Sequence, residues 1–516
     1  MGEHRLRFDT LIVGAGSAGN VLASRLTEDP ARRVLLLEAG PDYPTIESLP
    51  DDLRLGYGTD AGIAAMSHDW GYSGQATPLC SDMIVPRGRV VGGSSAVNSQ
   101  IYLRGVPEDF EAWAAMGNDR WSFDQVLPYF CKVENDHDFG GAAYHGDDGP
   151  IGVRRYSREE WAPVHQAWVD ASRDAGFPDC PDANRPHTTG TGPYPLNNID
   201  GVRQSTAVTY LAGARGRPNL QIEANCTTRR VLVEGGRAVG VEVERGGQLE
   251  QRYADEVVLS AGAIASPQIM MLSGFGPETH LRAIGIDVRG HLPGVGRNLR
   301  DHPTASLRWH LKFRPATNRH WLQTGLRYTA DGSEMANDMI VYLFASPVLP
   351  DDPDEFLNVL PVVNLAVGQG ELRLRSDDIH DRPLLDYRYF EEDLDRKRQR
   401  EGLRLCMELV EGHAPFRELL GPMMRSPGSD LHDDDALDRW MLGYAETCHH
   451  SSGTCKMGPE TDPLAVADQS GRVHGVDGLR IVDASLMPDC VRANINATTM
   501  MMAEKIAAEM RAESEM

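Results

Sequence analysis

The 516-residue sequence has no long hydrophobic run, because glycine, serine or charged residues interrupt every apolar stretch well before the roughly 20 residues that a membrane-spanning helix needs. Basic residues are also scarce, with 51 Lys and Arg against 75 Asp and Glu, and the formal net charge is −24. The overall field of such a chain repels nucleic-acid phosphates and anionic lipids. We therefore expect no transmembrane anchor and no nucleic-acid partner.

Targeting and metal-binding patterns are missing as well. Residues 1–10 contain no separate apolar segment followed by a cleavage site, as a secretory signal would. The eight cysteines have neither Cys-x-x-Cys spacing nor the paired spacing of a zinc site, and no two of the 17 histidines have His-x-x-x-His spacing. We expect a cytoplasmic protein with free thiols and no metal site.

What is present is a globular composition, 41% hydrophobic and 24% charged, and a βαβ pattern at the start of the chain. Apolar strands are predicted over 8–13 and 34–37, and a Gly-x-Gly-x-x-Gly motif at 14–19 leads into a helix over 20–27. Backbone amides and a helix N-terminus at such a turn hold a pyrophosphate. Glu38, at the end of the second strand, is placed to accept hydrogen bonds from the ribose of an adenosine, which disfavours NADP.

This motif does not by itself choose between FAD and NAD. The segment 88–99, Gly-Arg-Val-Val-Gly-Gly-Ser-Ser-Ala-Val-Asn-Ser, favours FAD. Its two adjacent glycines allow a close backbone approach, and its hydroxyl groups are short donors that suit a second phosphate contact and the edge of a planar ring.

Further elements follow along the chain. A β-hairpin is predicted over 231–243 around two glycines, a buried strand over 256–259, and an apolar helix over 267–272. The segment 391–413 has the charge pattern of a solvated amphipathic helix. After Ala503 we expect an acidic, frayed tail.

Several stretches resemble the glucose-methanol-choline (GMC) oxidoreductase family of FAD enzymes. The resemblance is carried by the first βαβ unit with Glu38, by 88–98, by 262–276, by the connector 293–302, and by the C-terminal block 450–496. It implies an α/β fold with a discontinuous Rossmann-like FAD-binding domain and an α+β substrate-binding domain, an antiparallel sheet plus helices. The implied ranges are 1–155, 200–300 and 450–516 for the first domain, and 156–199 and 301–449 for the second.

The resemblance also implies a catalytic pair. His450 matches the family's active-site histidine, and Asn494 matches the second member of the pair. Histidine titrates near working pH and is a natural base for an alcohol proton. The implied reaction converts an alcohol to an aldehyde or ketone, with the proton going to His450 and a hydride to flavin N5. The role of His449 stays open, and His302 is expected near the domain junction.

The implied FAD is noncovalent. Covalent members of the family bond the flavin to a histidine beside the asparagine of the Gly-Gly-Ser-Ser segment, and Val97 stands at that place here. The residues expected to bind the cofactor are Gly14, Gly16, Ser17, Gly19, Glu38, Ala39, Arg89, Gly92, Gly93, Ser94, Asn98, Ser99, Asp483, Ala484, Asn496 and Thr498.

Alternatives remain open at this stage. The enzyme is either an oxidase that passes electrons to O2 or a dehydrogenase that uses another carrier. Some family members instead split cyanohydrins without net redox chemistry, and a non-catalytic flavin protein is a third reading. The sequence predicts neither the substrate alcohol nor the oligomeric state.

Overall fold

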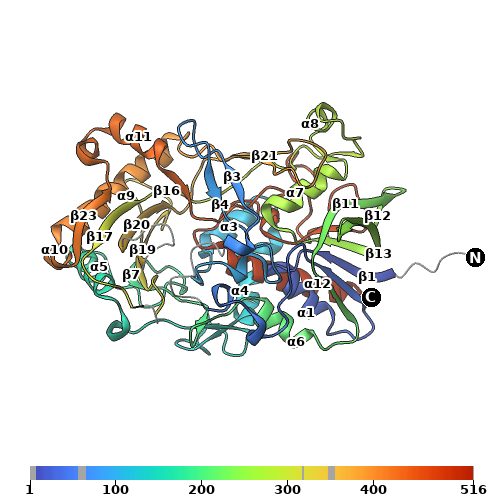
Figure 1. The fold of residues 1–516 in the computed structure, drawn as a ribbon, viewed down its shortest axis with the longest axis horizontal. Helices are drawn as coiled ribbons and strands as arrows, with labels where there is room; N and C mark the ends of the chain where they lie inside the picture. Colours follow the sequence, from blue (N-terminus) through green and yellow to red (C-terminus); the bar gives the residue numbers. More distant parts are fainter. Residues whose placement is uncertain (1–6, 56–65, 317–318, 347–354, 515–516) are drawn as a thin grey trace, which may run out of the picture.

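Two large β-sheets organise the chain, one at the right of the view in Figure 1 and one at the left. The computed structural model describes residues 7–55, 66–316, 319–346 and 355–514. Most of the 1–10 segment considered above for a targeting signal, residues 1–6, lies outside the described residues. Within the described part of the chain, no helix is both long and apolar enough to cross a membrane.

The first sheet is mixed. Strands β10, β2, β1, β13 and β25 are parallel, and the long β13 then pairs antiparallel with β12, which pairs with β11. The inner strand β2 is buried along its whole length, as its continuous apolar sequence requires in a parallel sheet covered on both faces. In spatial order the strands are β10 (Leu220–Glu223), β2 (Val34–Leu37), β1 (Arg7–Val13), β13 (Gln248–Leu259), β12 (Arg237–Arg245) and β11 (Cys226–Glu234), with β25 (Leu479–Ile481) beside β13.

The second sheet is antiparallel throughout. Helices α5 (Pro163–Asp174) and α9 (Asp393–Gly412) contact its strands β18 and β20. Its strands are β23 (Leu420–Arg425), β17 (Leu307–Leu311), β20 (Phe356–Val363), β19 (Met339–Ser346), β18 (Thr324–Tyr328) and β7 (Gly190–Pro193), with β16 (Pro303–Ala305) pairing both β20 and β24 (Ala445–Thr447). An α/β unit beside an antiparallel sheet with helices confirms the expected fold class. The exact domain boundaries stay a prediction.

The chain after Ala503 is not a frayed tail, as predicted, but continues helix α12 (Ile495–Ser514). The helix packs against α1 (Ser17–Leu26) and α4 (Phe123–Val133), and Glu504 on it is fully buried. That carboxylate accepts a hydrogen bond from Arg25 Nε at 2.7 Å and pairs with Lys132 at 2.8 Å. The expectation was wrong because partners distant in the sequence neutralise an acid that looks solvated in the local sequence.

The other predicted elements are present with shifted ends. The hairpin turns at Gly235 and Gly236 as expected, and α9 lies within the predicted 391–413. Helix α7 (Gly262–Leu272) starts five residues before the predicted 267–272. The cause is nonlocal, because Asp483 Oδ2 accepts the backbone N–H of Gly262 at 2.8 Å and so supports the start of the helix.

The remaining elements are short. They are β3 (Tyr72–Gly74), β4 (Met83–Val85), β5 (Glu134–Asp136), β6 (Ile151–Val153), β8 (Asn198–Ile199), β9 (Val202–Arg203), β14 (Phe275–Gly276), β15 (Gly290–His291), β21 (Glu371–Arg373), β22 (Leu384–Asp386), α2 (Asp51–Arg54), α3 (Pro107–Ala115), α6 (Ala212–Ala214), α8 (Glu278–Ala283), α10 (Ala414–Leu419) and α11 (Asp434–Gly443).

Candidate active site

A long cavity begins at the carboxyl ends of β1, β2 and β13, the edge of a parallel sheet where ligands bind. It continues to the segment that follows β24. Most of the predicted site residues line it. These are Gly14, Gly16, Ser17, Glu38, Ala39, Gly93, Ser94, Asn98, Ser99, His450, Asp483, Ala484, Asn494 and Asn496.

The glycine motif forms the first part of this cavity. Gly14 has a φ of +98°, and a side chain there would collide with the carbonyl oxygen of Ser260. A Cβ on Gly16 would meet only the Cα of Gly93, at 3.8 Å, so the space in front of the turn is open. The hydroxyl of Ser17 donates to Asn496 Oδ1 at 2.7 Å and thereby joins the starts of α1 and α12. This part of the cavity has the open space and the free helix N-terminus that a pyrophosphate needs.

Glu38 lies at the end of β2 and is held by two backbone amides. Its carboxylate accepts from Ala15 N at 3.0 Å and from Gly40 N at 2.8 Å. Burial raises the pKa of this carboxyl to about 7, although the amides act in the opposite direction. Each oxygen keeps a lone pair for a further donor, so the geometry suits the ribose hydroxyls for which Glu38 was predicted.

The Gly-Gly-Ser-Ser segment crosses the cavity opposite the glycine motif. Gly92 has a φ of +109°, and the turn of 3-10 helix Gly93–Ala96 follows it. A Cβ on Gly93 would lie 2.7 Å from the Cα of Gly16, which shows how closely the two glycine-rich loops approach. Val97, the residue directly after this 3-10 turn, is buried and lines the cavity with a hydrocarbon side chain.

Strand pairing in the second sheet positions His450, one member of the predicted catalytic pair. Strands β16 and β24 are antiparallel, with Pro303 opposite Thr447, so the residues just before β16 lie beside those just after β24. This brings His302 to His450, whose Nδ1 atoms are 2.8 Å apart. Asn494, directly before α12, places its Nδ2 3.0 Å from His450 Nε2.

The hydrogen bonds around these side chains assign the tautomer of His450. The hydroxyl of Tyr342 donates to Asn494 Oδ1 at 3.1 Å, which leaves Nδ2 of the amide facing His450. Since Nδ2 donates, His450 Nε2 accepts and carries no proton. The proton of the neutral ring is then on Nδ1 and is donated to His302 Nδ1. His450 Nε2 is therefore unprotonated at the wall of the cavity, where its lone pair accepts from Asn494 Nδ2.

Electrostatics keep this base neutral. Burial is the main cause of a pKa of His450 well below the usual value, and His302, His449 and Arg87 lower it further. Burial also lowers the pKa of His302 to about 4. Both imidazoles are therefore uncharged at neutral pH, so each keeps one unprotonated ring nitrogen.

Asp301 fixes the backbone that carries the base. Its Oδ1 accepts the amides of His302 at 2.8 Å and His450 at 2.9 Å, and its Oδ2 accepts the hydroxyls of Tyr389 at 2.8 Å and Thr447 at 2.6 Å. Hydrogen bonds to a buried carboxylate are about twice as strong as neutral ones. The carboxylate thus joins the segments on either side of the β16–β24 pair.

Comparison with known proteins agrees with this arrangement. Two family models described as GMC oxidoreductase match the chain, an N-terminal one over residues 8–304 and a C-terminal one over residues 366–503. The chain belongs to the GMC oxidoreductase family. It is accordingly an FAD-dependent enzyme that oxidises an alcohol.

Curated GMC relatives match almost the whole chain. Mitochondrial choline dehydrogenase of Mus musculus is 38% identical over 540 residues, 96% of this chain and 88% of the relative. Oxygen-dependent choline dehydrogenase 1 of Chromohalobacter salexigens is 37% identical over 546 residues, 98% of this chain and 95% of the relative. Among solved structures, pyridoxine 4-oxidase from Mesorbium loti has a TM-score of 0.89 and 31% identity, over 98% of this chain and 99% of that one.

The residues present fit the FAD of a GMC enzyme. The open space at Gly16, the carboxylate of Glu38 and the N-terminus of α1 together suit an adenosine diphosphate, and the cavity continues from there to His450. These residues would hold the nucleotide half, while the Gly-Gly-Ser-Ser segment and the start of α12 would border the flavin. The individual contacts remain predictions.

Four predicted cofactor residues do not line the cavity. Gly19 packs in α1 against the carbonyl of Gly14. Gly92 lies in the Gly-Gly-Ser-Ser segment but does not line the cavity; it packs against the side chains of Ala96 and Ala207. The guanidinium of Arg89 lies over the ring of Trp70, 5.0 Å from its centre. Thr498 is fully buried in α12, and Thr499 lines the cavity one position later.

No role was predicted for Asp301 or Tyr342, and His302 was expected near the domain junction without a contact to His450. The structure shows that His302 contacts His450 directly. The connector 293–302 was matched to the family, but no local signal pairs it with a segment almost 150 residues later. Tyr342 lies in an ordinary apolar strand and carries no signal at all.

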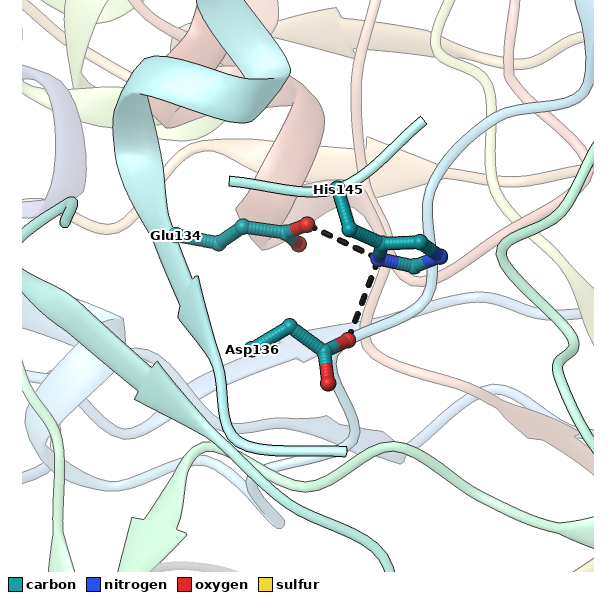
Figure 2. Close-up of side chains that lie close together, drawn as sticks. All are labelled: Glu134, Asp136 and His145. Carbon is teal, nitrogen blue, oxygen red and sulfur yellow. Dashed lines mark hydrogen bonds and ion pairs between the residues drawn. The ribbon is translucent and has the colours of Figure 1, made fainter. Parts of the chain in front are cut away.

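A buried cluster of acidic residues and a histidine was also not predicted from the sequence. Figure 2 shows Glu134, Asp136 and His145, whose ligand-type atoms lie within 4.8 Å of one another, away from the cavity. Arg104 pairs with Glu134, and Arg155 Nη1 lies 2.9 Å from Asp136 Oδ1. Burial alone would lower the pKa of His145, but hydrogen bonds to Asp136, Asp182 and Glu134 together raise it to about 10. We interpret the cluster as a charge-compensated ion-pair network, since cations already occupy the carboxylates.

Proposed function

We propose that His450 is the base that takes the hydroxyl proton of the substrate alcohol, and that Asn494 orients the hydroxyl oxygen. The single observation that carries this proposal is the hydrogen-bond network that leaves His450 Nε2 unprotonated at the wall of the cavity.

The proton moves between defined atoms. A substrate hydroxyl that enters at the pair replaces the direct hydrogen bond between Asn494 Nδ2 and His450 Nε2. It donates to His450 Nε2, and its oxygen accepts from Asn494 Nδ2. The imidazolium that forms keeps its Nδ1 proton directed to neutral His302, which retains the ring orientation. FAD, when bound, supplies the acceptor for the hydride of the carbinol carbon. Loss of the hydroxyl proton makes that hydride easier to release.

Replacement of the base tests the assignment. We expect His450→Ala to lower the rate of anaerobic flavin reduction by roughly 10² to 10⁴ while FAD stays bound. An unchanged reduction rate would place the base elsewhere.

We propose that FAD is bound without a covalent link, because the side chain of Val97 has no nucleophile. Acid precipitation should release the yellow flavin into the supernatant. Colour that remains in the pellet would contradict this proposal.

The electrons of the reduced flavin go to O2 or to a separate carrier. Admission of air to the reduced enzyme distinguishes the two, since rapid return of the oxidised spectrum identifies an oxidase and slow return identifies a dehydrogenase.

We propose that the protein acts in the cytoplasm. The eight unpaired cysteines, several of them buried, suit a reducing compartment. Cell fractionation tests this proposal.

We propose that residues 1–155, 200–300 and 450–516 form the FAD-binding domain and that 156–199 and 301–449 form the substrate-binding domain. The strands of the first sheet fall in the first set of ranges and those of the second sheet in the other. Limited proteolysis tests these boundaries.

A further inference from the structure

The cavity around His450 has an unusual distribution of charge. Among the described residues that line it, Arg87 is the sole Lys or Arg, and the carboxylates are Glu38 and Asp483. Glu38 is held by backbone amides at the nucleotide end. Asp483 accepts hydrogen bonds from the start of α7 and from the hydroxyls of Ser266 and Ser485. Glu38 is predicted to bind the ribose and Asp483 is hydrogen-bonded to the start of α7, so we expect neither carboxylate to pair with a cationic substrate.

Arg87 follows β4 and is only half-buried, but one of its donors is enclosed. Its backbone N–H donates to Asp69 Oδ1 at 2.7 Å, and its Nη1 donates to the carbonyl of Pro86 at 2.6 Å. Its Nη2 is buried and has no hydrogen-bond partner among the described residues. After burial, the charge of Arg87 is among the causes that lower the pKa of both His449 and His450. A buried charged donor without a partner is costly, which indicates that an acceptor binds there.

His449 contributes a second unsatisfied polar atom. Its backbone φ is +69°, a strained conformation for a residue other than glycine that concentrates at functional sites. The amide of His449 is held by Thr447 Oγ1 at 2.7 Å, and its Nδ1 is buried without a partner among the described residues. Burial lowers the pKa of His449 to about 4, so the ring is neutral and offers one donor and one acceptor.

We propose that Arg87 and His449 form an anion-binding subsite beside His450, so that the preferred substrate is an alcohol that also carries an anionic oxygen group, such as a carboxylate. The proposal rests on the proposed function of the same site. A quaternary ammonium alcohol, such as the choline in the names of the relatives, would bring its charge toward Arg87 with no free carboxylate among the described lining residues. Like charges in a site of low dielectric repel strongly.

Binding is tested first, without turnover. Acetate and benzoate are titrated into the FAD-loaded enzyme, and the change in the visible flavin spectrum is followed. We expect at least one of them to bind, with affinity weakened about 10- to 100-fold in Arg87→Met, as for loss of a charged hydrogen bond. The exposed Arg439→Met is the matched control and should bind like the wild type. His449→Asn, which tolerates the positive φ, should have an intermediate effect.

Selectivity is tested second, by anaerobic flavin reduction. We expect 4-(hydroxymethyl)benzoate to exceed 4-methylbenzyl alcohol, or glycolate to exceed ethylene glycol, in kcat/KM. The ratio within the preferred pair should fall at least about tenfold in Arg87→Met and recover in part in Arg87→Lys.

Several results would overturn the subsite. These are failure of both anions to bind, equal anion affinity in Arg87→Met, or faster reduction by choline than by any of the anionic alcohols. Loss of FAD from Arg87→Met with an unchanged anionic preference would assign the guanidinium to the flavin instead. If no alcohol reduces the flavin but anion binding still depends on Arg87, the oxidation proposal fails and the subsite stands.

Discussion

Replacing Asn494 by aspartate, an isosteric change, should move the titration of the catalytic base. In the wild type the amide Nδ2 donates to His450 Nε2 at 3.0 Å and favours the unprotonated ring. A carboxylate at the same distance favours the protonated ring. With an effective dielectric constant of about 20, the attraction between the two charges is about 5.5 kcal/mol, or about 4 pH units in the pKa of His450.

Burial of the new charge opposes part of this shift, so we expect the pKa to rise by at least about 2 units. The neutral ring is the active form, and the rate is lost as pH falls through the pKa. The acidic limb of the wild-type profile therefore lies below about 6.5, and in Asn494→Asp it should lie at least about 2 pH units higher than in the wild type. At a pH on the acidic limb of the wild type, the variant should reduce its flavin at least tenfold more slowly than the wild type.

The assay is stopped-flow measurement of anaerobic flavin reduction across pH, with FAD content measured for each sample. Asn225→Asp adds the same charge at an exposed turn and serves as the control, for which the profile should not move. If the limb of Asn494→Asp coincides with that of the wild type at equal FAD content, the amide does not set the protonation of the base and the reasoning is refuted.

Three further predictions follow from other parts of the structure. Asp301→Asn turns charged hydrogen bonds into neutral ones, so it should lower the free energy of unfolding by about 1–3 kcal/mol in a denaturant titration. It should also slow flavin reduction in stopped flow, because His450 is displaced. If both values are unchanged, Asp301 does not hold this segment in place. In Gly16→Val the added Cβ comes no nearer to the backbone than 3.8 Å, and the side chain occupies the open space at the turn. The variant should therefore bind FAD at least tenfold more weakly in a fluorescence titration and keep its circular dichroism spectrum. The pKa of His145 is raised in the folded protein, so the hydrogen bonds of the protonated ring, including that to Glu134, stabilise the fold fully below about pH 6.5. This stabilisation is lost as pH rises toward 10. The melting temperature should therefore fall over this range, and it should fall less in His145→Gln.

Local sequence patterns were enough to predict the elements that border the nucleotide end of the cavity. The βαβ unit and the glycine turn lie within about 30 consecutive residues, and their periodicity and turn chemistry are sufficient signals. The same holds for the hairpin at Gly235 and Gly236. The start of α7 was missed because its support comes from Asp483, more than 200 residues away.

The catalytic half depended on a resemblance and was incomplete. His450 and Asn494 were proposed from it, but the pairing of β16 with β24 that delivers His302 and Asp301 is a tertiary event without a local pattern. The buried Glu504 was misjudged for the same reason, since its cations lie in distant helices. Charged residues are read from sequence as solvated by default, and burial with partners overrides that default.

The position of α12 has a consequence for biosynthesis. The glycine turn at 14–19 is synthesised nearly 480 residues before Asn496, which the hydroxyl of Ser17 contacts, and Asn494, whose amide contacts His450. Over this length of synthesis the nascent protein carries the glycine turn without the predicted catalytic pair beside it. The pair is complete only when α12 has been synthesised and has packed against α1 and α4.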